Sequence, residues 1–125
     1  MSFNWLEYFN LAQELVGQTG TPAGQEARQR SAISRAYYAA FCQARNHLRD
    51  QEGHSLPGDG QVHAYVRDQF RDSPDSRRKQ IGENLNRLRI DRNKADYEDS
   101  VPRLDTMTVR DMTLAQQVLA MLSQL

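Results

Sequence analysis

Apolar residues recur along most of the chain at steps of three and four, which is the spacing of one face of an α-helix. Five segments show this spacing, at about residues 4–16, 22–51, 61–71, 74–96 and 108–122. Alternation of apolar and polar residues, which is typical of a strand, appears nowhere convincingly. The pattern predicts an all-α fold, an up-and-down bundle of four to five helices that forms a single domain over residues 1–125.

Local signals suggest where three of these helices begin. Thr21-Pro22 and Ser73-Pro74 each place a capping hydroxyl before a proline, which suits the first position of a helix. Thr108 with Asp111 resembles a capping box and predicts the start of the last helix. Pro102 is expected to keep the fourth and fifth helices apart.

The fourth segment contains an arginine where its pattern calls for an apolar residue. Ile81, Leu85, Leu88 and Ala95 form one stripe, and Arg92 falls on the same stripe. An arginine keeps its charge, so it must be paired there, or the stripe must open onto an interface or a cleft. A pair with Asp96, four residues on, would contribute only about 0.3–0.5 kcal/mol if exposed. We therefore expect a functional site around Arg92.

Charge and composition exclude several classes of partner. Sixteen basic and sixteen acidic residues cancel, so no overall field indicates nucleic acid or a membrane. Residues 71–94, however, carry eight basic groups against four acidic ones, which indicates either a local anion site or internal pairing. No apolar run approaches the ~20 residues of a membrane span. The single cysteine fits a reducing compartment, and no signal peptide is evident, so we expect a cytoplasmic protein.

The second segment carries a mixed aromatic and basic stripe, composed of Arg35, Tyr38, Cys42, Arg45 and Arg49. It is either a half-exposed flank whose long side chains lie over the core or a surface for a dimer partner or ligand. The arginines could lower the pKa of Cys42, although a small packed residue is the simpler interpretation.

No metal or cofactor is predicted. The three histidines have neither accompanying cysteines nor the helical i, i+4 spacing of zinc ligands. His63 is expected to be a cap or a partly buried polar group near the start of the short third helix.

Two blocks of sequence, residues 31–41 (SAISRAYYAAF) and 84–97 (NLNRLRIDRNKADY), resemble the two signature helices of the HEPN domain (higher eukaryotes and prokaryotes nucleotide-binding). The resemblance spans nearly the whole chain. It implies a helical bundle that forms a homodimer through its two long helices. Many members of this family are metal-independent RNA endonucleases, and many bacterial toxins among them are encoded beside a minimal nucleotidyltransferase that acts as antitoxin.

The resemblance also assigns residues. Arg92 takes the place of the family's catalytic arginine, Asn93 takes the polar place, and Tyr97 stands where active nucleases have a histidine. Histidine suits proton transfer near neutral pH, whereas tyrosine can donate a proton but is a poor base. The predicted RNA- or nucleotide-binding residues are Arg35, Tyr38, Arg89, Arg92 and Asp96.

Three hypotheses about function follow. The first is a homodimeric module that binds RNA or nucleotide phosphate, in a toxin–antitoxin or defence system with a nucleotidyltransferase partner. The second is a ribonuclease in which Tyr97 acts as the acid, Arg92 stabilises the phosphate and Asn93 orients the substrate. The third is a structural dimer in which Arg92 pairs with an acidic residue of the second subunit.

Overall fold

The computed structural model describes residues 2–18 and 24–125, and this part of the chain is helical apart from its connecting segments. The helices are α1 (Leu6–Gly17), α2 (Gln25–Asn46), α3 (Asp59–Arg71), α4 (Ser76–Tyr97) and α5 (Leu104–Leu122), with a π-helical turn η1 (His47–Gln51) that continues α2. The prediction of an all-α bundle is confirmed. The predicted cap at Thr21-Pro22 lies outside the described residues.

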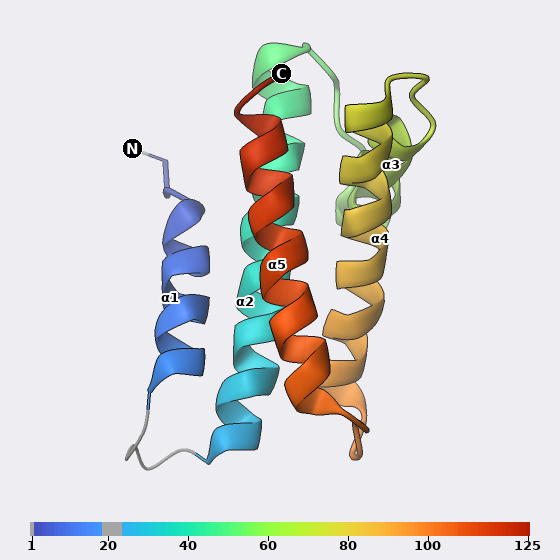
Figure 1. Cartoon of the computed structure of the whole chain (residues 1–125). Coiled ribbons are helices and arrows are strands. Elements are labelled where there is room, and N and C mark those ends of the chain that lie inside the picture. Colours follow the sequence, from blue (N-terminus) through green and yellow to red (C-terminus); the bar gives the residue numbers. More distant parts are fainter. Residues whose placement is uncertain (1, 19–23) are drawn as a thin grey trace.

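Helix α2 is the centre of the bundle, and α1, α4 and α5 all pack against it (Figure 1). Helix α3 packs mainly on α4 and runs parallel to α2. His63, near its start, stacks on Phe41, and Phe70, near its end, lies beside His47. The largest fully buried apolar side chains are those of Tyr37, Phe70, Ile33, Leu48, Ile81, Leu88, Val66 and Val118. This core holds α2, α3 and α4 around the region of Arg92.

The predicted start of α4 needs a correction. The capping side chain is that of Asp75, which accepts a hydrogen bond of 2.9 Å from the backbone N–H of Arg78. The Ser73 hydroxyl instead accepts from the backbone N–H of Asp75, inside the turn. Aspartate and serine are equally good caps, so the Ser-Pro signal alone placed the helix start two residues too early.

The predicted start of α5 was also wrong. The helix begins at Leu104, four residues before Thr108, after Arg103 adopts a left-handed backbone with φ 57°. Thr108 is buried inside the helix and its hydroxyl donates to the carbonyl of Leu104. The first turn forms because Leu104 and Met107 bury their side chains against Ile33 and Ala95.

A close approach of backbones fixes α3 against α4. A Cβ atom at Gly82 would lie 2.3 Å from the backbone nitrogen of Arg71. Real Cβ atoms do not approach backbone atoms this closely, so only glycine permits this contact. The register between the two helices is therefore set where the end of α3 meets Gly82.

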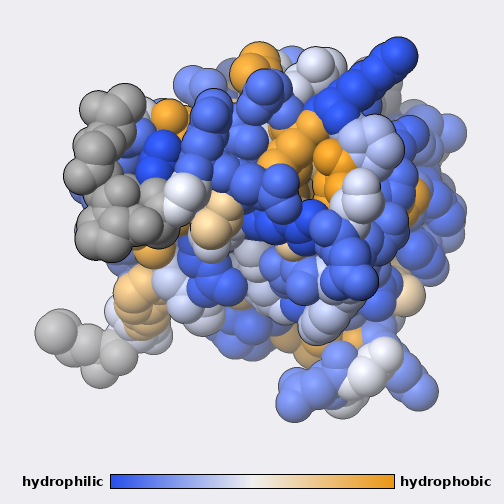
Figure 2. Space-filling view, turned by 90° about the horizontal axis from the view of Figure 1, so that it is seen from below, coloured by the Kyte–Doolittle hydropathy of each residue, from blue (hydrophilic) through white to orange (hydrophobic). Residues whose placement is uncertain are grey.

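None of the described helices combines the length and the apolar character needed to cross a lipid bilayer. Figure 2 views the end of the bundle where α4 ends and α5 begins. The surface there is mainly hydrophilic, with small and separate hydrophobic patches.

Candidate functional site

The Arg92 side chain lines a cavity of about 430 Å³ between α1, α2, α3 and α4. The cavity is lined by aromatic, basic and a few acidic side chains: Trp5, Tyr8, Ser34, Arg35, Tyr38, Phe41, Cys42, Arg45, Asp59, Val62, His63, Arg92 and Asp96. Four helices therefore bring together residues that lie up to 91 positions apart. Both alternatives that the sequence left open for Arg92 occur together, because the side chain lines this cavity and is also paired with Asp96.

The Arg92 side chain is held in place but keeps a donor for a ligand. It is 18% exposed, and its Nε lies 2.9 Å from the Asp96 carboxylate. This N–H does not point at the oxygen, so the contact is an ion pair without a hydrogen bond. One terminal nitrogen, Nη1, donates to the side chain of Asn93, and the guanidinium carbon lies 5.1 Å from the Tyr38 ring. Nη2 makes no hydrogen bond within the described residues.

Two further arginines reach the cavity from α2, and two aromatic rings hold them, one on α1 and one on the residue just before it. The Arg35 guanidinium lies 4.6 Å from the centre of the Tyr8 ring, and that of Arg45 lies 5.5 Å from the Trp5 ring. A guanidinium over an aromatic face is attracted to it but keeps the hydrogen-bond donors at its edge. These donors can therefore be directed at a phosphate or carboxylate.

A histidine from α3 completes the wall opposite α1. The Nδ1 atom of His63 lies 2.5 Å from the Tyr37 hydroxyl, and its ring stacks on Phe41 with ring centres 4.1 Å apart. Burial and, to a smaller extent, the charges of Arg89, Arg92 and Arg45 together lower the pKa of His63 to about 4. The imidazole is therefore neutral at pH 7.

Acidic side chains only partly offset these charges. Three arginines line the cavity against two carboxylates, those of Asp59 and Asp96. Asp96 is engaged, because it pairs with Arg92 and accepts a hydrogen bond from the Ser34 hydroxyl. No group of three or more metal-ligating side chains occurs in the described part of the chain. The arrangement suits an anion better than a cation.

Most of the predicted binding residues meet here, whereas two of the predicted catalytic ones do not line the cavity. Arg35, Tyr38, Arg92 and Asp96 line it. Asn93 is exposed. Arg89 does not line the cavity, yet its charge acts on both Tyr37 and His63.

Tyr97 forms the last residue of α4, and its side chain is 74% exposed. Its ring centre lies 5.7 Å from the Arg92 guanidinium carbon, on the outside of the cavity. The tyrosine therefore contacts the arginine but does not share its cavity.

Sequence reasoning missed His63 and the aromatic residues of α1 as site residues. Trp5 and Tyr8 belong to the first apolar segment, at about residues 4–16, and helical spacing alone does not distinguish a core residue from a residue that lines a cavity. The pairing of His63 with Tyr37 spans 26 residues and has no local signal.

The neighbouring arginines do not lower the pKa of the Cys42 thiol below its ordinary value. Burial raises the pKa of its thiol to about 11, although Arg45 and Arg35 act in the opposite direction. The side chain is only 3% exposed. The thiol is therefore protonated at neutral pH and serves as a small packed residue.

The end of α4 is anchored to the start of α2 by Arg30. Its Nη1 donates to the carbonyls of Ala95 and Glu98, at 3.0 and 2.6 Å, and its Nη2 donates to that of Asp99 at 3.2 Å. The last carbonyls of a helix lack partners within the helix, and a cation is favourable there. Arg30 thus fixes the segment that carries Arg92 and Asp96.

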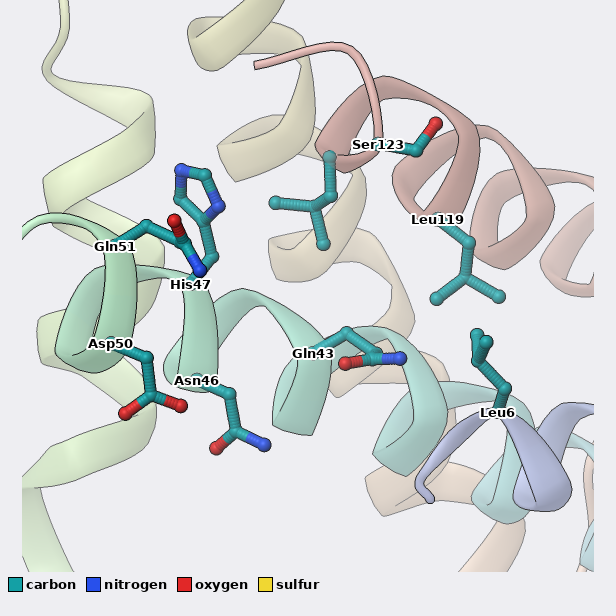
Figure 3. Close-up of a pocket in the computed structure, with 9 residues that line it drawn as sticks. Leu6, Gln43, Asn46, His47, Asp50, Gln51, Leu119 and Ser123 are labelled. Carbon is teal, nitrogen blue, oxygen red and sulfur yellow. The ribbon is translucent and has the colours of Figure 1, made fainter.

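A second cavity, of about 390 Å³, lies between the end of α2, η1 and the end of α5. Figure 3 shows Gln43, Asn46, Asp50 and Gln51 on one side, facing Leu6 and Leu119 of two other helices. It has no arginine or lysine in its lining, and its histidine, His47, is paired with Glu52. This cavity lacks the converging cations that an anion site requires.

No protein-family model, no curated protein and no solved structure matches this chain.

Proposed function

We propose that this chain is a module that binds the phosphate groups of RNA or of a nucleotide, of the HEPN type that the two signature blocks resemble. The observation that carries the proposal is the convergence of Arg35, Arg45 and Arg92 on one cavity with aromatic walls. Guanidinium groups bind phosphate oxygens in pairs, and aromatic faces stack on bases. One site thus offers both kinds of contact that a nucleotide needs.

The first experiment measures binding of a labelled single-stranded RNA by fluorescence anisotropy, with inorganic phosphate as competitor. Replacing Arg92 or Arg45 with alanine should weaken binding by about tenfold or more, because each change removes charge-assisted hydrogen bonds worth about 1.5–3 kcal/mol. The slope of log affinity against log salt should also become shallower.

Arg87→Ala is the matched control, because Arg87 is an exposed arginine of the same helix and does not line the cavity. It should leave RNA affinity nearly unchanged. Equal losses in the Arg87, Arg45 and Arg92 variants would instead indicate diffuse attraction to the whole basic segment and would contradict a phosphate site in the cavity.

The homodimer through the two long helices, α2 and α4, belongs to the same proposal. Its support is the exposure of Ile90 and Tyr97 on α4, at 40% and 74%. Light scattering at micromolar concentration tests it, since a particle of 14.4 kDa would be a monomer. Joint action with a nucleotidyltransferase is tested by co-expression and co-purification with a minimal nucleotidyltransferase, if one is encoded beside this chain.

A second candidate function is metal-independent RNA cleavage, and the presence of His63 in the same cavity as Arg92 favours it. In this reaction a base takes the proton of a 2′-hydroxyl, the 2′-oxygen attacks phosphorus, and the 5′-oxygen leaves with a proton. Incubation of RNA with the protein in EDTA tests this. His63→Gln and Arg92→Ala should abolish cleavage, whereas Tyr97→Phe should abolish it only if Tyr97 is the acid.

A further inference from the structure

His63 is placed so that the cavity can reach one of its ring nitrogens. Its Nδ1 is bonded to Tyr37. Its Nε2 has no hydrogen-bond partner within the described residues, and it is not among the fully enclosed unpartnered atoms. The ring cannot turn freely, because Phe41 stacks on it at an angle of 11°. The imidazole thus presents Nε2 to whatever occupies the cavity.

Among the charged groups around this ring, arginines outnumber carboxylates. The surrounding groups come from α1 (Tyr8), α2 (Arg35, Tyr37, Tyr38, Cys42, Arg45), α3 itself (Asp59) and α4 (Arg89, Arg92, Asp96). Among them, Arg45, Arg89 and Arg92 act on His63 most directly, and each opposes a positive charge on the ring. In the empty cavity the imidazole is therefore neutral.

We propose that His63 is itself a phosphate-binding residue, which takes up one proton from solvent as an anion enters the cavity and then donates a hydrogen bond to it. This inference rests on the proposed function, because it assumes that the anion is bound by the same arginines. An anion offsets the arginine charges that oppose protonation of the ring, so proton and anion bind cooperatively.

The Tyr37 hydroxyl can keep its hydrogen bond to His63 when the imidazole becomes protonated. A hydroxyl both donates and accepts, so it can serve either neutral tautomer of His63 and the imidazolium as well. After protonation, Nδ1–H donates to the Tyr37 oxygen and Nε2–H donates to the anion. No side chain has to leave its place, and the only atom gained by the protein is the proton.

The expected result is anion affinity that falls as pH rises. If the bound anion brings His63 back towards its ordinary pKa, affinity should drop roughly tenfold between pH 5 and pH 8. Sulfate is the suitable probe, because it stays fully ionised over this range and its own titration cannot cause the effect. Binding is followed by NMR chemical shifts at constant ionic strength.

Variants assign the effect to His63. His63→Gln keeps a polar group but cannot become a cation, so its sulfate affinity should be nearly the same at pH 5 and pH 8. The double variant His47→Gln/His54→Gln is the matched control, since both of these histidines contact Glu52 outside the cavity. It should keep the full pH dependence of the wild type.

A direct readout on the wild type covers the case in which His63→Gln does not fold. The NMR titration of the His63 ring should show a pKa at least one unit higher in saturating sulfate than in chloride. Equal pKa values in the two salts would overturn the inference, as would pH dependence that survives in folded His63→Gln. Failure of the proposed function looks different, because sulfate would then bind at neither pH.

Discussion

Two neighbouring residues of α4, Asp91 and Arg92, place charged groups in contrasting surroundings, one in a closed helix interface and the other in an open cavity. Arg92 faces an open cavity and is 18% exposed, whereas the Asp91 side chain is completely buried against α5. Asp91 accepts a hydrogen bond of 2.6 Å from Arg110, but its other oxygen and both oxygens of the buried Asp111 have no hydrogen-bond partner among the described residues. The Arg110 Nε lies 3.7 Å from one Asp111 oxygen, in an ion pair without a hydrogen bond. A charge in a cavity can be offset by a ligand, while a charge in a closed interface has to be neutralised by a proton or by the protein itself.

The two surroundings also affect protonation differently. Burial, followed by the nearby Asp91, raises the pKa of Asp111 to about 8, and the charge of Arg110 partly opposes this. At pH 7 the Asp111 carboxyl group is therefore protonated. The interface between α4 and α5 is most stable when that proton is present, whereas the cavity gains its proton only with a ligand.

The largest expected effect comes from Asp111→Asn. In the wild type the folded state holds a proton that the unfolded state releases near pH 4, so the free energy of unfolding should fall as pH rises from about 4 to about 8. At pH 9 the variant should be more stable than the wild type by a few kcal/mol, and at pH 4 the two should be similar. Urea unfolding at both pH values measures this, and an unchanged pH profile in the variant would refute a protonated Asp111.

A smaller loss is expected from Arg110→Gln. This change removes the charged partner of Asp91, and breaking a buried pair by removing one side is destabilising. Because the Arg110 side chain is 45% exposed, solvent reduces the effect to about 1–2 kcal/mol at pH 7. Arg87→Gln, on the exposed face of the same bundle, is the control in the same urea experiment and should change stability little. Equal stabilities of the Arg110 and Arg87 variants would show that the pair contributes nothing.

The smallest effect on stability is expected from Arg92→Gln. Its ion pair with Asp96 is an i, i+4 pair on one helix, worth about 0.3–0.5 kcal/mol when exposed, so the loss should stay below about 1 kcal/mol. Thermal unfolding measures this beside the binding assay. A loss above about 2 kcal/mol would instead favour a purely structural arginine.

The sequence was enough to predict features that depend on local periodicity. The helices follow from apolar spacing, and Arg92 was singled out because a permanent charge conflicts with an apolar stripe. The stripe through Arg35, Tyr38, Cys42 and Arg45 was also visible, and the cavity is lined by all four of these residues. Arg49, one turn further, is exposed and pairs with Asp50, because the helix widens to a π-turn there.

Features that depend on packing between distant segments could not be predicted in this way. The spacing of Thr108 and Asp111 is that of a capping box, whereas the burial of Asp111 depends on how α5 packs on α4. His63 had no sequence signal, since its importance comes from Tyr37 and Phe41 on another helix. Which helices share the cavity is a property of the bundle and not of any one segment.

The tight contact at Gly82 has a consequence for how the cavity can change its width. Helix α3 is in backbone contact with α4 at Arg71, and Arg30 links α4 to α2 through hydrogen bonds. These contacts keep the helices that carry His63, Arg92 and Arg45 in fixed positions relative to one another. Helix α1 packs chiefly on α2 and only lightly on α5. A larger ligand would therefore enter the cavity through an outward movement of α1, together with Trp5 and Tyr8.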